Sequence, residues 1–83
     1  MTKINQNNQL KSLRRQIDAV DRRIVREIKN RLNIASLIGK EKKHLDLPII
    51  NTARELEVIS RVEKGFFQSI FKLIIQESRK VQI

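Results

Sequence analysis

The fold is decided by the stretch LKSLRRQIDAVDRRIVREIKNRLNIASLIGKEK, residues 10–42. Apolar residues recur every three or four positions along it, which is the period of an α-helix with one hydrophobic face. Two basic residues, Arg31 and Lys42, stand in the same phase as the apolar ones. The pattern therefore predicts one long helix, over roughly residues 8–43, whose apolar seam also carries cationic side chains.

Two shorter helices are expected after the long one. The segment 44–51 holds the only proline of the chain and is expected to be a loop, and either Asn51 or Thr52 can cap a second helix over residues 53–64. A third helix is expected from Phe66 to the end of the chain. The predicted fold class is all-α, with one long and two short helices per chain.

The composition fits one small domain. The chain has 83 residues, of which 33% are charged and 40% hydrophobic, so a large or multi-domain enzyme is excluded. Residues 1–9 are polar and are expected to be disordered, which leaves residues 10–83 as the helical domain. The start of the chain does not resemble a signal peptide and no apolar run approaches a membrane span, so we expect a cytoplasmic protein without a membrane partner.

The charge and the rare residue types narrow the function. Eighteen Lys and Arg face nine Asp and Glu, a formal charge of +9 that favours an anionic partner such as nucleic acid, acidic membrane or a small polyanion. Nucleic acid is disfavoured because aromatic residues are scarce and no recognisable binding motif is present. With no Cys and only one His, His44, neither a thiol nucleophile nor a metal centre is expected, and no cofactor is implied.

The length of the predicted long helix indicates that the chain assembles with a second copy. A helix over residues 8–43 would be about 54 Å long, so two helices less than half that length cannot cover its whole seam. The exposed remainder is expected to pair with a second copy in a two-fold homodimer. Arg14 lies 17 residues before Arg31, about 25 Å along the helix, so it cannot reach the same site within one chain. It is either a solvated surface charge or a residue delivered into the partner's site.

Arg31 and Lys42 point in nearly the same direction. They are eleven residues apart, which is about 1100° of helical rotation and so roughly 20° from alignment. Their long side chains can close on an anionic ligand between them. The alternative is that both side chains extend along the helix to reach solvent.

Further polar residues occupy apolar faces of the two short helices. Glu55 faces inward, although Thr52-x-x-Glu55 also matches a capping box. Ser78 and Gln82 lie in core phase, where a single polar residue often only satisfies the core or sets register. An antiparallel hairpin brings the start of the second helix, with Arg54 and Glu55, level with the end of the third. These groups are therefore expected to converge beside the long helix as a ligand site.

The sequence resembles the all-helical, AroQ-class chorismate mutases over about residues 10–82. The resemblance rests on these motifs: Leu13-Arg14-x-x-Ile17-Asp18-x-x-Asp21, Arg31, Gly39-Lys40-x-Lys42, Arg54-Glu55 and Ser78-x-x-x-Gln82. In that family two chains interlock through the long helix and form two identical sites, each of which borrows one arginine from the partner. The resemblance thus implies an interlocked two-fold dimer that forms a helical bundle.

The resemblance also implies a reaction, the Claisen rearrangement of chorismate to prephenate in aromatic amino acid biosynthesis. It implies that Lys42 and Gln82 donate hydrogen bonds to the ether oxygen of the breaking C–O bond. Arg31 would bind a substrate carboxylate and belongs with them to the catalytic set. Catalysis would come from selection of the reactive conformer and from stabilisation of charge on the ether oxygen, without a metal or a cofactor.

The remaining substrate-binding residues follow from the same resemblance. Arg14 of the partner chain would bind a carboxylate, and Arg54 and Ser78 would complete the surroundings of the carboxylates. Glu55 would hold the ring hydroxyl. Asn51, at a position where the family commonly has an aspartate, is placed at the substrate as well.

Two other functions stay open. An isochorismate-pyruvate lyase of the same fold would share the basic residues, although Glu55 and Ser78 favour the mutase. A non-catalytic basic helical module is the other alternative. It would either serve only for dimerisation or bind nucleic acid or acidic membrane through a stripe of exposed cations: Arg15, Arg22, Arg23, Arg26 and Lys29.

Overall fold

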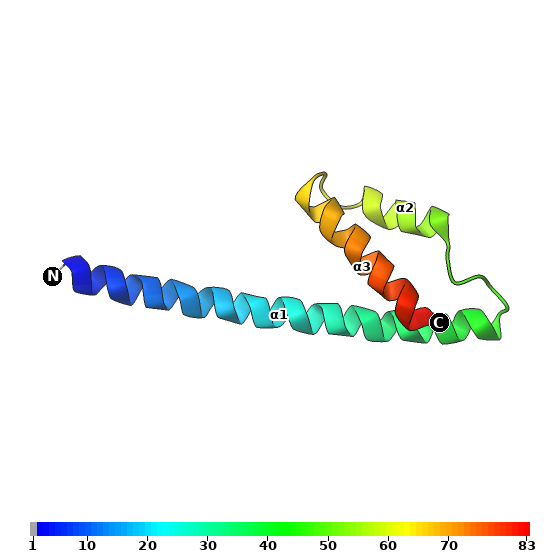
Figure 1. Cartoon of the computed structure of the whole chain (residues 1–83), viewed down its shortest axis with the longest axis horizontal. Helices are drawn as coiled ribbons and strands as arrows, with labels where there is room; N and C mark the ends of the chain where they lie inside the picture. The colour runs from blue at the N-terminus through cyan, green and yellow to red at the C-terminus, as the bar shows by residue number, and fades with distance from the viewer. Residues whose placement is uncertain (1) are drawn as a thin grey trace.

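The computed structural model describes the backbone of residues 2–83 and the side chains of residues 7–83. Three helices follow one another along the chain: α1 (Thr2–His44), α2 (Thr52–Ser60) and α3 (Phe66–Gln82). The described residues contain no strand, and the predicted all-α fold of one long and two short helices is confirmed. Figure 1 shows α1 as a single rod, with α2 and α3 folded back as a hairpin over its C-terminal half.

The first helix begins at Thr2, several residues earlier than expected. The chain contains neither proline nor glycine before Gly39, so nothing interrupts the helix once it has formed. Of the segment 1–9, which the composition predicts to be disordered, Met1 lies outside the described residues and residues 2–9 continue α1. The division into this segment and a domain over 10–83 stays a prediction.

The end of α1 is a Schellman motif. Asp46 adopts a left-handed conformation with φ of 57°, and its N–H donates to the carbonyl of Lys43 at 3.2 Å. The N–H of Leu47 reaches back to the carbonyl of Lys42 at 2.8 Å. These two bonds satisfy carbonyls that the helix end leaves unpaired, and Pro48 then prevents the helix from resuming.

The second helix is capped by Asn51. Its side-chain oxygen Oδ1 accepts from the backbone N–H of Arg54 at 3.1 Å, which settles the choice between Asn51 and Thr52. The helix ends at Ser60 rather than near residue 64.

The end of α2 is hydrogen-bonded to α3. The side-chain amide of Gln68 donates to the carbonyl of Ile59, in the last turn of α2, at 3.2 Å and to that of Val62, just after the helix, at 3.5 Å. Local bonds satisfy the neighbouring carbonyls, since the N–H groups of Arg61 and Val62 donate to Val58 and Ile59. Gly65, with φ of 85°, does not end α2. It supplies the left-handed backbone with which the chain turns into α3.

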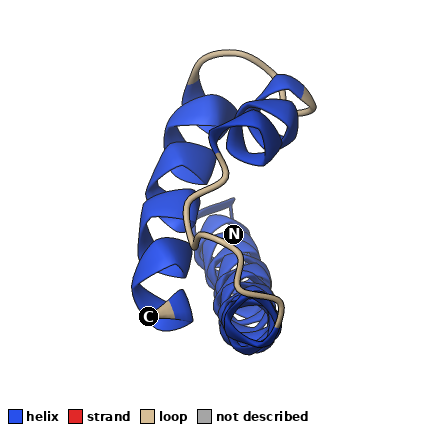
Figure 2. Cartoon of the chain, turned by 90° about the vertical axis from the view of Figure 1, so that its right-hand side faces the viewer, coloured by secondary structure: helices blue, strands red, loops and turns tan. Residues whose placement is uncertain are grey.

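The hairpin rests on α1 through α3 alone. Within the described residues α3 packs against α1 and α2 packs against α3, whereas α2 makes no comparable contact with α1 (Figure 2). The buried side chains are few and lie at the α1–α3 crossing: Ala35, Ile75 and Ser78. The hairpin thus leaves a space between α1 and α2.

The N-terminal half of α1 extends away from the hairpin (Figure 1). The protein measures 67 × 25 × 15 Å with a radius of gyration of 18.7 Å, well above the roughly 12 Å of a compact chain of this length. The apolar seam on this half is exposed, with Ile17 at 60% as an example. Its other members are Leu10, Leu13, Val20 and Ile24. Nowhere in residues 2–83 does a helix combine the length and apolarity that a bilayer crossing requires.

Candidate functional site

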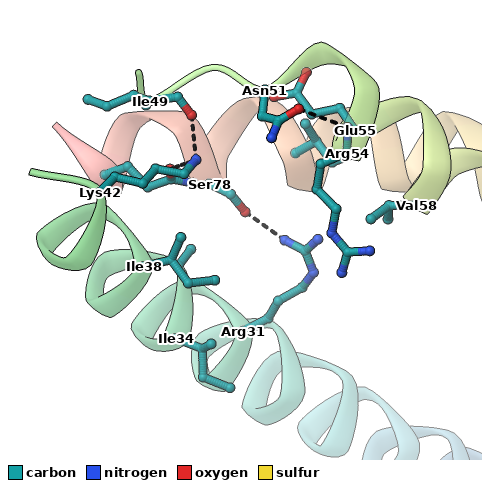
Figure 3. Close-up of a pocket in the computed structure, with 13 residues that line it drawn as sticks. Arg31, Ile34, Ile38, Lys42, Ile49, Asn51, Arg54, Glu55, Val58 and Ser78 are labelled. Carbon is teal, nitrogen blue, oxygen red and sulfur yellow. Dashed lines mark hydrogen bonds between the residues drawn. The ribbon is translucent and has the colours of Figure 1, made fainter. Parts of the chain in front are cut away.

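A cavity of about 360 Å³ lies between the C-terminal half of α1, the start of α2 and the end of α3. Its volume falls within the range of roughly 300–1,000 Å³ that is typical of small-molecule sites. Figure 3 shows polar side chains from all three helices directed into this space. The polar and charged lining residues are Arg31, Lys42, Asn51, Arg54, Glu55, Ser78 and Gln82. The apolar part of the wall consists of Ile34, Ala35, Ile38, Ile49, Val58 and Ile75.

Every polar lining residue is one that the sequence places in the candidate site. The exception among the expected residues is Arg14, which does not line this cavity and lies exposed on the projecting half of α1. The antiparallel hairpin explains the convergence, since it sets the first turn of α2 beside the last turns of α3. The structure of one chain therefore brings together all expected groups except the one assigned to the partner.

Arg31 is oriented by Ser78. The guanidinium Nη1 donates to the serine Oγ at 2.7 Å, and the same hydroxyl donates to the carbonyl of Ile74 at 2.7 Å. Ser78 is only 5% exposed, so this hydrogen-bonded pair fixes the arginine at the cavity wall (Figure 3). Arg31 does not extend to solvent along the helix, which was the alternative for a cation in apolar phase.

Lys42 joins α1 to both the loop and α3. Its Nζ donates to the carbonyl of Ile49 at 2.5 Å and to Oε1 of Gln82 at 2.8 Å. An ammonium has three N–H donors, so one is left for a ligand. Because Gln82 accepts through its oxygen, its amide nitrogen Nε2 keeps both N–H groups for the cavity. The arrangement places an ammonium donor and an amide donor side by side.

The last turn of α3 is held closely against α1. A Cβ built on Gly39 would stand 2.6 Å from both the Cα and the carbonyl oxygen of Gln82, so only glycine permits this approach. Next to it, Lys43 Nζ donates to the carbonyl of Ile83 at 2.6 Å. The last turn, which carries Gln82, is therefore packed and hydrogen-bonded rather than frayed.

The first turn of α2 supplies a cation and a carboxylate. The side chain of Arg54 extends toward the cavity and Arg31 (Figure 3), and it also forms an ion pair with the exposed Glu57 one turn further along. Such an exposed pair stabilises little and can be exchanged for a ligand carboxylate. Asn51 lines the cavity through its role as the helix cap.

Glu55 does not act as part of a capping box. Its Oε2 accepts from Arg79 Nε at 2.9 Å, and its Oε1 forms a second, short bond with Arg79 Nη2. The pKa of Glu55 is lowered, first by the hydrogen bond from Arg79 and then by the charges of Arg79 and Lys42, while partial burial opposes the shift. The pKa of Arg79 is raised by the same hydrogen bond. Glu55 is therefore ionised at neutral pH.

Arg79 is a charged residue beside the site that the sequence did not reveal. It follows Ser78 and lies outside apolar phase, which is typical of a solvated surface charge. Its position along the hairpin could have indicated its role, because the residue after Ser78 must lie opposite the first turn of α2.

The balance of charge defines the ligand class. Three cations, Arg31, Lys42 and Arg54, and one carboxylate, Glu55, line the cavity. Together with the amide of Gln82, these groups suit a small dianion that carries a hydroxyl and an additional acceptor oxygen. No residue of the cavity is a nucleophile of the thiol or histidine kind.

The comparisons with known proteins agree with this geometry. The family model described as chorismate mutase type II matches residues 13–83. A bifunctional chorismate mutase/prephenate dehydratase from Aquifex aeolicus is 36% identical over 66 residues, which is 76% of this chain and 18% of that protein. A 3-dehydroquinate dehydratase from Pyrobaculum aerophilum is 36% identical over 74 residues, which is 89% of this chain and 24% of that protein. The chain thus spans a quarter or less of these curated relatives.

A solved structure has the same fold. It is a conserved hypothetical protein from Pyrococcus furiosus, 47% identical, with a TM-score of 0.81 over 90% of this chain and 96% of that one. The family match covers most of the chain, including every polar residue of the cavity, and confirms the resemblance seen in the sequence. The chain belongs to the chorismate mutase type II family.

Proposed function

We propose that the protein is a chorismate mutase, which rearranges chorismate to prephenate in aromatic amino acid biosynthesis. The observation that carries the proposal is the composition of the cavity wall, in which three cations, one carboxylate and the amides of Asn51 and Gln82 meet. Chorismate offers a matching set of groups: two carboxylates, a ring hydroxyl and an ether oxygen. The family match supports the same substrate.

The rearrangement breaks one C–O bond and forms one C–C bond within a single molecule, so it needs no nucleophile, proton relay or external atom. Arg31 and Arg54 bind carboxylates and hold the reactive conformer. Lys42 and the Nε2 group of Gln82 donate to the ether oxygen, where negative charge develops. Even the low end of enzymatic acceleration, about 10⁶-fold, corresponds to about 8 kcal/mol, which fixed charge-assisted donors and conformer selection together can supply.

The proposal includes a two-fold homodimer with interlocked long helices. Two observations support it: the apolar seam on the projecting half of α1 is exposed, and the cavity lacks the fourth cation expected from the sequence. Antiparallel pairing of two α1 helices would cover the seam and deliver the partner's Arg14 to the cavity. The assembly buries apolar surface and completes the site in one step.

A direct assay tests the activity. Purified protein is incubated with chorismate, the decay of chorismate absorbance is followed, and the product is identified by chromatography. We expect prephenate. Formation of pyruvate would assign the lyase reaction of the same fold instead, and the absence of any turnover would leave a binding or dimerisation module.

A mixing experiment tests the shared site. Arg14→Ala and Lys42→Ala chains are each expected to be nearly inactive. After subunit exchange one of the two sites in each heterodimer carries both residues intact, so part of the activity should return. If proven heterodimers show no recovery, Arg14 does not act across the dimer.

A further inference from the structure

Arg79 binds the Glu55 carboxylate on the side that faces away from the cavity. Its Nε and Nη2 each donate to a different carboxylate oxygen, the two-pronged geometry that fixes both the position and the plane of a carboxylate. Glu55 lines the cavity and its side chain is 18% exposed, whereas Arg79 does not line the cavity and is 42% exposed. The arginine therefore approaches from the solvent side and leaves the inner face of the carboxylate to a ligand.

The ion pair matters because α2 depends on α3 for its position. Within the described residues α2 packs on α3 and not on α1. Polar side chains tie this hairpin at its two ends: Gln68 bonds the carbonyls at the end of α2, and Arg79 bonds Glu55 in its first turn. The second tie sets how far the first turn of α2 stands from the cavity.

We propose that Arg79 is a positioning residue, which holds the Glu55 carboxylate at the cavity wall in the orientation that accepts a hydrogen bond from a ligand hydroxyl. The inference rests on the proposed function, in which that hydroxyl is the one on the ring of chorismate. Each carboxylate oxygen has two acceptor lone pairs. One pair on each oxygen serves Arg79, and the others are available to the substrate.

Arg79 also lowers the pKa of Glu55. The charged groups that act on this carboxylate are Arg79 from α3 and Lys42 from α1. Arg31 from α1 and Arg54 from α2 line the same cavity, and they bond Ser78 and Glu57. Of the causes that lower the pKa of Glu55, the hydrogen bond from Arg79 is the largest, and burial is the opposing one. Without Arg79 both its hydrogen bond and its charge are lost, so the pKa of Glu55 rises.

The test compares Arg79→Met with Lys80→Met. Methionine keeps the length of the apolar stem and removes the donors and the charge. Lys80 is the neighbouring exposed cation, paired with Glu77 on the surface, so its variant loses the same charge away from the cavity. Circular dichroism confirms that both variants fold. A third variant, Arg79→Lys, keeps the charge but replaces the two-pronged contact with a single donor.

Two readouts are measured for each variant. The first is the pKa of Glu55, from the pH dependence of its side-chain carboxyl carbon signal in NMR, which does not depend on turnover. The second is kcat/KM for chorismate as a function of pH. We expect Arg79→Met to raise the pKa of Glu55, to lower kcat/KM about 10- to 100-fold at pH 7, and to move the acid limb of the profile to higher pH. For Arg79→Lys the pKa of Glu55 and kcat/KM should lie between those of the parent and of Arg79→Met. For Lys80→Met both should equal those of the parent.

The outcomes separate this inference from the proposed function. If the parent converts chorismate and Arg79→Met keeps the parent's kcat/KM and pH profile, Arg79 has no positioning role. If the parent does not convert chorismate, the proposed function fails, and the NMR titration still decides whether Arg79 controls the carboxylate. An unchanged pKa of Glu55 in Arg79→Met would overturn the inference in either case.

Discussion

Replacement of Gly39 by alanine should separate Lys42 from Gln82, the two groups proposed as donors to the ether oxygen, while the fold is kept. The new Cβ would stand 2.6 Å from two backbone atoms of Gln82, whereas ordinary van der Waals contact begins at 3.4 Å. The last turn of α3 must therefore retreat by about 0.8 Å, the difference between these distances. Backbone atoms cannot yield as a flexible side chain does, so the whole turn moves.

The retreat acts on the hydrogen bond from Lys42 to Gln82, which is 2.8 Å long and would be stretched beyond normal range. A misplacement of about 1 Å near reacting atoms costs up to about 10²-fold in rate, so kcat should fall roughly 10- to 100-fold. Alanine gains about 1 kcal/mol of helix propensity over glycine, and overpacking costs about 1–3 kcal/mol. The net destabilisation is therefore small, about 0–2 kcal/mol.

The assay measures kcat and KM with chorismate, together with thermal unfolding, for Gly39→Ala and for the control Asn33→Ala. Asn33 is exposed on α1, so alanine there raises helix propensity without touching α3. In a Gln82→Ala background, Gly39→Ala should cause little further loss of kcat, because both changes act through the same donor. A Gly39→Ala variant with the parent's kcat and a higher Tm would refute the reasoning.

Three further results are expected. Gln82→Glu should be slow at neutral pH and regain activity in acid, because a carboxyl group donates a hydrogen bond only when it is protonated. The activity of the parent should stay constant between about pH 5 and 8, and a variant with the same pH dependence as the parent would contradict this. Arg31→Lys should lower kcat/KM about tenfold or more although the charge is kept, because a lysine lacks the planar guanidinium that can bond a carboxylate and Ser78 at the same time. Kinetics close to those of the parent would exclude a two-pronged contact between Arg31 and a substrate carboxylate. The ion pair of Glu55 and Arg79 lowers the pKa of the carboxyl, so its stabilising effect is present at neutral pH and is lost as the pH falls through that lowered value. The Tm difference between parent and Arg79→Met should accordingly close in acid, and a difference that persists there would assign the effect to packing.

The course of the helices could largely be predicted from the sequence, because apolar periodicity and the position of Pro48 are local signals. The exact ends could not. The helix α1 extends back to Thr2, since no proline or glycine precedes Gly39 to interrupt it, and α2 stops at Ser60, where Gln68 of α3 also bonds the carbonyl of Ile59. The contact from Gln68 joins residues of two helices, so the local pattern of α2 does not show it.

The residues of the cavity could likewise be predicted only in part. Arg31, Lys42 and Ser78 were accessible to sequence reasoning because a polar residue in apolar phase must face other groups. Arg79 was not, since its phase is that of a surface residue and only the level of the hairpin brings it to Glu55. The tight contact at Gly39 was equally hidden, because a glycine within a helix does not reveal what lies against it.

The gap between α1 and α2 has a consequence for what substrate does to the protein. These two helices do not pack on each other in the described chain, and each presents an arginine, Arg31 or Arg54, to the space between them. A dicarboxylate bound to both arginines would connect α1 to α2 and stabilise their relative position, as a bound metal ion stabilises a small domain. By mass action such a ligand at 100 times its Kd adds about 2.7 kcal/mol to the free energy of unfolding. An unreactive dianion of the same span would restrain α2 in the same way, so it should raise the thermal stability of the protein without any turnover.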